Sequence, residues 1–131
     1  MKYLLMMTGE KAGVDAYRAW QEKDIQTHFA YLRQLNQELT DSGEFVDTQG
    51  LALPHLAKVV RAGQNHVPIT DGVFPESKEF LLGYWIVDVE TPERAYAIAA
   101  MASAAPGPGG APLNMPIEVR PVMSGPPPEM L

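Results

Sequence analysis

The sequence predicts a single α+β domain in which two helices cover one mostly antiparallel sheet. Two apolar segments, at 2–7 and 80–89, do not alternate with polar residues, so we expect two strands that are covered on both faces. The segment at 21–42 carries apolar residues at three- and four-residue intervals, the period of an amphipathic helix. A chain of 131 residues, 46% of them hydrophobic, is long enough for one domain with a core.

The N-terminal half predicts a strand, a helix and an extended segment. After the strand at 2–7, residues 8–20 read as a polar connection with a short helical turn near its end. The helix at 21–42 should end at Gly43, which stands where a C-terminal cap belongs. Residues 44–53 are expected to be extended. The predicted apolar stripe of the helix consists of Ile25, His28, Phe29, Leu32, Leu35 and Leu39.

The middle of the chain predicts a hairpin and then the longest strand. Residues 58–61 and 66–70 would be the two strands of the hairpin, joined by a turn at 63–65. Pro68 cannot donate a backbone hydrogen bond, so the strand that contains it should be an edge strand or carry a bulge. After a charged loop, residues 80–89 form the longest predicted strand.

The C-terminal part predicts a second helix and a last strand. Thr91 is a suitable N-cap, with proline and an acidic residue directly after it. A connection rich in proline and glycine at 105–116 leads to a strand at 117–123, and the tail at 124–131 has nothing to pack and should be mobile. The small buried face predicted for the helix consists of Ala95, Ile98, Ala99 and Ala102.

This order of elements, β-α-β-(β-β)-α-β, is typical of a ferredoxin-like arrangement of residues 1–123. Helices cover only one sheet face in that fold, yet two strands are apolar on both faces. We therefore expect a second copy to cover the other face, which gives a homodimer and a dimeric α+β barrel. The alternative is a monomer in which residues 8–20 or the tail fold over the sheet.

Composition limits the partners and the location. The formal net charge of −6 and the absence of a basic run argue against binding nucleic acid. With no cysteine, neither a disulfide nor a thiolate metal site can form. No segment resembles a signal peptide or a membrane span, so we expect a cytoplasmic protein. The three histidines lack zinc-ligand spacing and no cofactor motif is present, so we expect neither a metal nor a cofactor.

The charged loop offers the first candidate site residues. Asp71-Gly72 is a turn signal, so Asp71 either caps its own turn or acts as a catalytic group. Glu76 and Lys78, followed by Glu79, are either an exposed charge cluster or a buried group that orients an anionic substrate. In the functional interpretation Lys78 is catalytic and Glu76 binds the substrate.

His28 and two aromatic residues complete the candidates. His28 lies on the apolar stripe of the first helix, either as a core histidine bonded to a backbone carbonyl or as a general base oriented by Asp47 or Asp71. Tyr84 and Trp85 point to opposite faces of the long strand, so one of them could stack on a planar ligand in a cavity.

The segment "TDGVFPESKEFLLGYWIVDV" resembles the signature of the DGPF group within the YCII-related family. The matching residues are Asp71, Gly72, Phe74, Glu76, Lys78, Glu79, Gly83 and Tyr84. Val73 departs from the motif, which has proline there. The resemblance covers nearly residues 1–123 and implies a small dimeric α+β barrel, in which Phe74 and Tyr84 would contact the substrate. The segment "HFAYLRQL" from His28 is similar to a family helix whose histidine, with an aspartate, is proposed as a dyad.

Two functions of different classes follow. The first is a cofactor-independent enzyme that carries out acid/base chemistry of the lyase, isomerase or hydrolase type on a small molecule, with His28, Asp71 and Lys78 as catalytic residues. The second is a non-catalytic module that binds a ligand or a partner protein. Genes of the resembling group often stand beside sigma-factor genes, which makes a regulatory partner one form of this alternative. A purely structural dimerisation domain is a third possibility.

Overall fold

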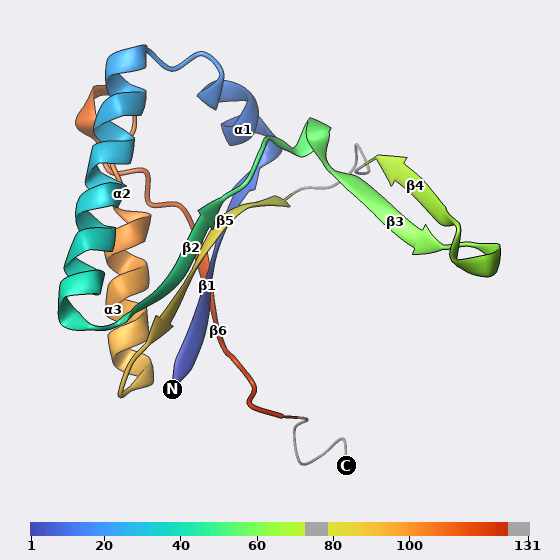
Figure 1. The fold of residues 1–131 in the computed structure, drawn as a ribbon. Coiled ribbons are helices and arrows are strands. Elements are labelled where there is room, and N and C mark those ends of the chain that lie inside the picture. Colours follow the sequence, from blue (N-terminus) through green and yellow to red (C-terminus); the bar gives the residue numbers. More distant parts are fainter. Residues whose placement is uncertain (73–78, 126–131) are drawn as a thin grey trace.

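Four antiparallel strands form the main sheet, in the order β2-β5-β1-β6 (Figure 1). They are β1 (Lys2–Glu10), β2 (Phe45–Gly50), β5 (Glu79–Asp88) and β6 (Ile117–Pro121). This computed structural model describes residues 1–72 and 79–125. The predicted α+β class is confirmed, and the strand order agrees with the ferredoxin-like arrangement. The described residues form an open sheet, not a closed barrel.

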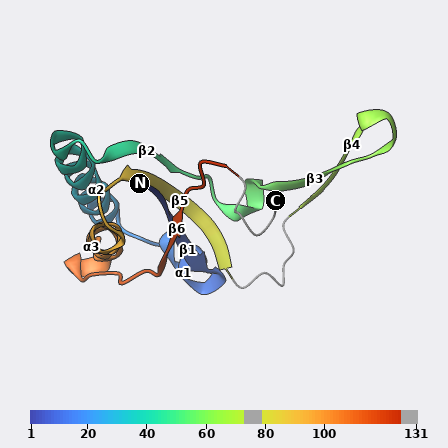
Figure 2. The ribbon, with the colours of Figure 1, turned by 90° about the horizontal axis from the view of Figure 1, so that it is seen from below.

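Two helices, α2 (Glu22–Ser42) and α3 (Pro92–Ser103), cover one face of this sheet (Figures 1 and 2). A third helix, α1 (Lys11–Tyr17), follows β1 directly at one end of the sheet. The predicted polar connection at 8–20 was therefore partly wrong, since β1 continues to Glu10 and the helix begins at once. No helix in the described part of the chain is long and apolar enough to cross a membrane.

The helix ends are formed as the sequence predicts. The hydroxyl of Thr91 accepts a hydrogen bond from the backbone N–H of Arg94 at 3.2 Å, which satisfies one unpaired donor of the first turn of α3. Gly43 ends α2 with a φ of 79°, a left-handed conformation that glycine adopts without steric cost. Both capping predictions are confirmed.

The core lies between the helices and the adjacent sheet face. Trp85 is 4% exposed there, and its ring N–H donates to the side-chain oxygen of Asn36 at 2.8 Å. The predicted buried face of α3 is confirmed. Phe29 was wrongly placed in the core, because its side chain is 44% exposed. Successive helix residues differ by about 100°, so Phe29 lies at the border of the stripe that His28 and Leu35 occupy. The fully buried large side chains are Leu5, Leu39, Ile98 and Val87.

A second, two-stranded sheet projects from the body of the protein on the side away from the helices (Figures 1 and 2). Its strands are β3 (Lys58–Ala62) and β4 (Pro68–Gly72), so the predicted hairpin is confirmed. We call residues 58–72 the arm. Every residue of its two strands except Val59 is exposed. An isolated two-stranded hairpin is at best marginally stable in water, so the arm lacks the packing that normally supports such a structure.

The ion pair between Glu44 and Arg94 gives a pH-dependent stability. Arg94 donates two hydrogen bonds of 2.8 Å to the two oxygens of Glu44. These bonds hold the pKa of Glu44 below its ordinary value of 4.5. Because the folded-state pKa is depressed, the stabilisation is present above pH 4.5 and is lost as the pH falls through the lower, folded-state value.

We expect Glu44→Gln to lower the free energy of unfolding at pH 7 by about 1 kcal/mol, since the pair is partly exposed. The deficit should shrink as the pH falls below 4.5 and through the lower pKa of Glu44 in the folded protein, where the wild-type carboxylate becomes protonated. Urea unfolding at pH 7 and at acidic pH measures it, and Glu38→Gln, on the exposed side of α2, is the control. An equal deficit at both pH values would contradict the assignment.

Candidate functional site

Asp71 lies in the arm and is not at a turn. It belongs to β4, where it stands opposite Val59, and its carboxylate accepts a hydrogen bond from Arg61 at 2.8 Å. Both side chains are more than half exposed. Gly72 also belongs to β4 and is not among the glycines with positive φ. Strand pairing with β3 extends through Gly72, and the loop that follows lies outside the described residues, so the interpretation of Asp71 as the cap of that loop stays a prediction.

Three other predicted site residues, Phe74, Glu76 and Lys78, lie outside the described residues. Their assignment to substrate binding and catalysis stays a prediction. Residues 126–131 of the predicted tail also lie outside the described residues.

His28 is buried and has a structural partner. Its side chain is 7% exposed, and its Nδ1 lies 3.0 Å from the backbone oxygen of Pro106. A carbonyl oxygen only accepts, so Nδ1–H is the donor. The ring also meets Trp20 and Phe29 edge-on, with centroids 5.6 and 5.2 Å away. This is the arrangement of a core histidine that fixes the connection after α3 against α2.

Neither predicted aspartate is hydrogen-bonded to His28. Asp71 pairs with Arg61 in the arm, on the far side of the sheet from α2 (Figure 1). Asp47 accepts a hydrogen bond from Tyr84 instead. The structure therefore does not bring His28, Asp71 and Asp47 together as one group.

Two shallow hollows lie near these residues without gathering reactive groups. One, of about 530 Å³, lies between the start of α2 and the connection after α3, and includes Trp20, Lys23 and Asp24. The other, of about 470 Å³, lies between residues 51–57 and the start of β5 and has a mostly apolar lining. No three histidine, aspartate or glutamate side chains of the described residues are placed to share a metal ion.

The sheet face opposite the helices, which we call the open face, carries an apolar centre. Trp85 points to the helices and Tyr84 to the open face, so the predicted division of these two aromatics is confirmed. The strand register aligns Leu4 with Ile86 and Met6 with Tyr84. All four of these side chains are only partly exposed, although no helix of the described chain covers them (Figure 2).

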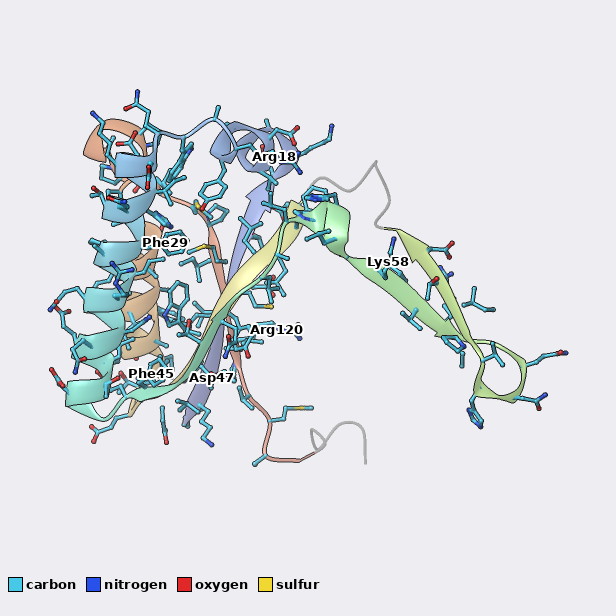
Figure 3. The ribbon with its side chains drawn as sticks, turned by 45° about the horizontal axis from the view of Figure 1, so that its top comes forward. Arg18, Phe29, Phe45, Asp47, Lys58 and Arg120 are labelled. Carbon is cyan, nitrogen blue, oxygen red and sulfur yellow. The ribbon has the colours of Figure 1, made fainter. Side chains whose placement is uncertain are left out.

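Tyr84 and Asp47 form the one polar pair at this apolar centre that the structure describes. The Tyr84 hydroxyl donates to Oδ2 of Asp47 at 2.9 Å. A register shift in β2 brings Asp47 to the same sheet face as Tyr84. Phe45 is aligned with Val87 and packs against the core. Asp47 is aligned with Ile86 and lies on the open face (Figure 3). Strict alternation would put Phe45 and Asp47 on the same face, so the bulge at Val46 turns the carboxylate towards Tyr84.

The hydrogen bond to Asp47 raises the pKa of Tyr84 above its ordinary value of 10.0, with desolvation as a second cause. Tyr84 is therefore a neutral phenol at physiological pH, and it holds the carboxylate of Asp47 in a fixed orientation. Such a pair can accept a proton at the carboxylate, and the single phenolic O–H, donated here to Asp47, can turn to another acceptor once Asp47 is protonated. The sequence prediction named Tyr84 as a ligand-binding residue but missed Asp47 as its partner, because no sequence signal locates the bulge.

Comparison with known proteins adds the family. A search among curated protein sequences found no match. The sequence model of the YCII-related domain matches residues 1–107, which is most of the chain and includes both Asp47 and Tyr84. The chain belongs to the YCII-related family.

Proposed function

We propose that the protein is a cofactor-independent enzyme of the DGPF group, in which Asp47 and Tyr84 carry out acid/base chemistry on a small molecule at the open face. The observation that carries the proposal is the Tyr84–Asp47 hydrogen bond beside the apolar side chains of Met6 and Ile86. Asp47 would take a proton from an activated carbon or hydroxyl, and the Tyr84 O–H, released from Asp47 once that carboxylate is protonated, would donate to the oxygen that becomes negative. Lyase, isomerase and hydrolase steps all use such a transfer.

The proposal includes a cytoplasmic homodimer in which the open faces of two chains meet. The central side chains Leu4, Met6 and Ile86 are apolar, whereas the edge strands carry polar side chains. An apolar centre with a polar rim is typical of a protein interface. Burial of this face would enclose the Tyr84–Asp47 pair and exclude water, which strengthens electrostatic interactions in a site. The absence of cysteine agrees with a reducing compartment.

His28 and Asp71, the catalytic residues predicted from sequence, take supporting roles in this proposal. His28 ties α2 to Pro106, and Asp71 stiffens the arm through Arg61. Lys78, as a catalytic residue, and Glu76, as a substrate-binding residue, remain proposals for an anionic substrate, because an ammonium beside carboxylates can orient such a molecule.

Proton abstraction can be tested before the substrate is known. Small 2-oxo acids and lactones incubated with the protein in D₂O lose the NMR signal of an exchangeable C–H if Asp47 removes that proton. For a compound that exchanges, we expect Asp47→Asn to lower the exchange rate at least about 100-fold and Tyr84→Phe about 10-fold or more. These residues lie at the surface of a single chain, so both variants should fold.

Matched controls exist for both changes. Asp41→Asn and Tyr96→Phe alter exposed residues on the helix side of the molecule and should leave the exchange rate unchanged. Equal exchange by the wild type and Asp47→Asn for every compound that exchanges would remove the basis of the enzyme proposal.

A second candidate function, a partner-binding module, is supported by the arm. Its exposed apolar side chains, Val60, Val67 and Ile69, are 58%, 62% and 51% exposed. An arm of this kind can add to or clasp another protein. A regulatory partner such as a sigma factor would fit the genomic context that the family resemblance suggests. Loss of partner binding by an arm deletion, with C–H exchange absent in the wild type, would favour this function.

A further inference from the structure

The open face has a pattern of charges that specifies how two copies meet. Cross-strand pairing aligns Asp47, Ile86, Leu4 and Arg120 in one row across the sheet. An acidic residue therefore lies on one edge strand and a basic residue on the other, with two apolar side chains between them. Figure 3 shows Arg120 on the side of the sheet away from the helices.

The neighbouring rows follow the same rule. Gln49, Tyr84, Met6 and Glu118 form the next row, so an amide on β2 stands opposite a carboxylate on β6. On the other side of the first row, Asp88 of β5 is aligned with Lys2 of β1. Each row thus has complementary groups at equal distances from its middle, and in the last of them the Asp88 carboxylate also accepts a hydrogen bond from the N-terminal ammonium of its own Met1 at 3.1 Å.

These groups cannot all satisfy one another within a single chain. Three strand spacings, roughly 14 Å, separate β2 from β6, which is too far for an ion pair between Asp47 and Arg120 of one copy. Within residues 1–72 and 79–125, Arg120 has no ion pair or side-chain hydrogen bond. Its exposed guanidinium points towards the side where a second copy would pack.

Symmetry brings the complementary groups together. A two-fold axis that runs parallel to the strands, between β5 and β1, turns β2 of one copy over β6 of the other and keeps each position along the strands. Each row of one copy then packs against the same row of the other copy, running in the opposite direction. Asp47 therefore lies opposite the partner's Arg120, Gln49 opposite the partner's Glu118, and Lys2 opposite the partner's Asp88. An axis across the strands would instead place β2 over β2 and Asp47 near the partner's Asp47, where like charges repel.

We propose that a second copy of this chain packs on the open face about this axis, and that Arg120 of the partner subunit pairs with the Asp47 carboxylate that Tyr84 already holds. Packed sheets lie about 10 Å apart, a gap that an arginine and an aspartate extended towards each other can bridge. The inference rests on the proposed homodimer and makes each acid/base site depend on both copies. The guanidinium of the partner's Arg120 would donate hydrogen bonds to the Asp47 carboxylate and help to fix its position beside Tyr84.

Cross-linking tests the arrangement without any assay of activity. The chain has no cysteine, so two single-cysteine variants, Asp47→Cys and Arg120→Cys, carry one label site each. The two variants, distinguished by a size tag, are mixed and treated with a bismaleimide that spans about 10 Å, the spacing of packed sheets. We expect a strong cross-link between the Asp47→Cys and Arg120→Cys chains and little cross-linking within either variant alone.

Each of the other outcomes would overturn a different part of the proposed dimer arrangement. Links of Asp47→Cys to itself would show an axis across the strands, and no link in any mixture would show that the open faces do not meet. The cross-links report the arrangement of the copies, and C–H exchange by the wild type reports the acid/base chemistry, so the two failures are distinguishable. C–H exchange without any cross-link would show that the acid/base site does not depend on the second copy. If the links form as expected but no C–H exchange occurs, the dimer stands and the enzyme proposal fails.

Exchanging the two charges tests whether the ion pair between Asp47 and the partner's Arg120 stabilises the dimer. Arg120→Asp leaves the Tyr84–Asp47 pair intact but places two carboxylates together in the dimer, so we expect its dissociation constant to rise at least about 100-fold. The double variant Asp47→Arg with Arg120→Asp restores opposite charges and should dissociate within about 10-fold of the wild type. A double variant as weak as the single one would overturn the pairing.

Discussion

Replacing Leu4 by lysine should convert the proposed dimer into folded monomers. Leu4 lies at the apolar centre of the open face, beside Ile86. Its side chain is partly exposed in one chain, so a lysine there reaches water and leaves the fold intact. In the dimer the same ammonium would be buried against the partner without a counter-ion, and this occurs twice because of the two-fold symmetry.

The expected effect is large. A rise in the dissociation constant of at least about a thousand-fold corresponds to about 4 kcal/mol. Analytical ultracentrifugation at micromolar concentration should therefore change from a species of twice the 14.4 kDa chain mass to the chain mass itself. Circular dichroism should stay the same, because the core side of the sheet is untouched.

Tyr96→Lys is the matched control. Tyr96 is 55% exposed on α3, on the opposite side of the molecule, so the same chemical change should leave the dimer unaffected. If Leu4→Lys remains a dimer, the open face is not the interface. If the wild type is itself monomeric, the partner-binding function of the arm gains support over the enzyme.

Much of the fold could be predicted from sequence because its signals are local. The interval of apolar residues in α2, the Thr91-Pro92 start of α3 and the glycine at 43 each specify their own element. The strand 80–89 was recognised because its apolar residues occupy both faces. Phe29 was misplaced because the period of apolar residues in α2 does not define where the buried stripe ends. Only packing against α3 decides which residue at its border is buried.

The candidate site was predicted less well, since it depends on contacts between distant segments. Tyr84 was found because the alternation of β5 separates it from Trp85. Asp47 was seen only as a possible partner of His28, because the bulge that turns it to the open face depends on pairing between β2 and β5. Asp71-Gly72 was read as a turn because these residue types favour turns, but pairing with β3 overrides that preference.

Gly83→Ala should destabilise the protein and disturb the Tyr84–Asp47 pair together. A Cβ added at Gly83 would lie 2.8 Å from the backbone oxygen of Gln49 and 3.4 Å from Cα of Gly50. The first contact is with backbone in the neighbouring strand, so β2 must move away from β5. Overpacking of this kind costs roughly 1–3 kcal/mol in the free energy of unfolding. It also shifts Asp47, which lies two residues before Gln49.

Two measurements follow from this coupling. Urea unfolding should show the loss of stability, and titration of the Tyr84 phenol by ultraviolet absorbance should show its pKa falling back towards 10.0, since the hydrogen bond from Tyr84 to Asp47 is its main cause. Subtracting the curve of Tyr84→Phe isolates this phenol from the other four tyrosines.

Gly50→Ala is a control at the facing position. Gly50 is the cross-strand partner of Gly83, yet a Cβ added there meets nothing within 4 Å. Stability and the tyrosine titration should therefore stay close to those of the wild type. If both glycines tolerate alanine equally, close approach of β2 to β5 is not what positions Asp47. If Gly83→Ala loses stability but keeps the raised pKa of Tyr84, the bulge at Val46 must hold the pair independently of the strand end, and the site is more robust than its backbone contacts imply.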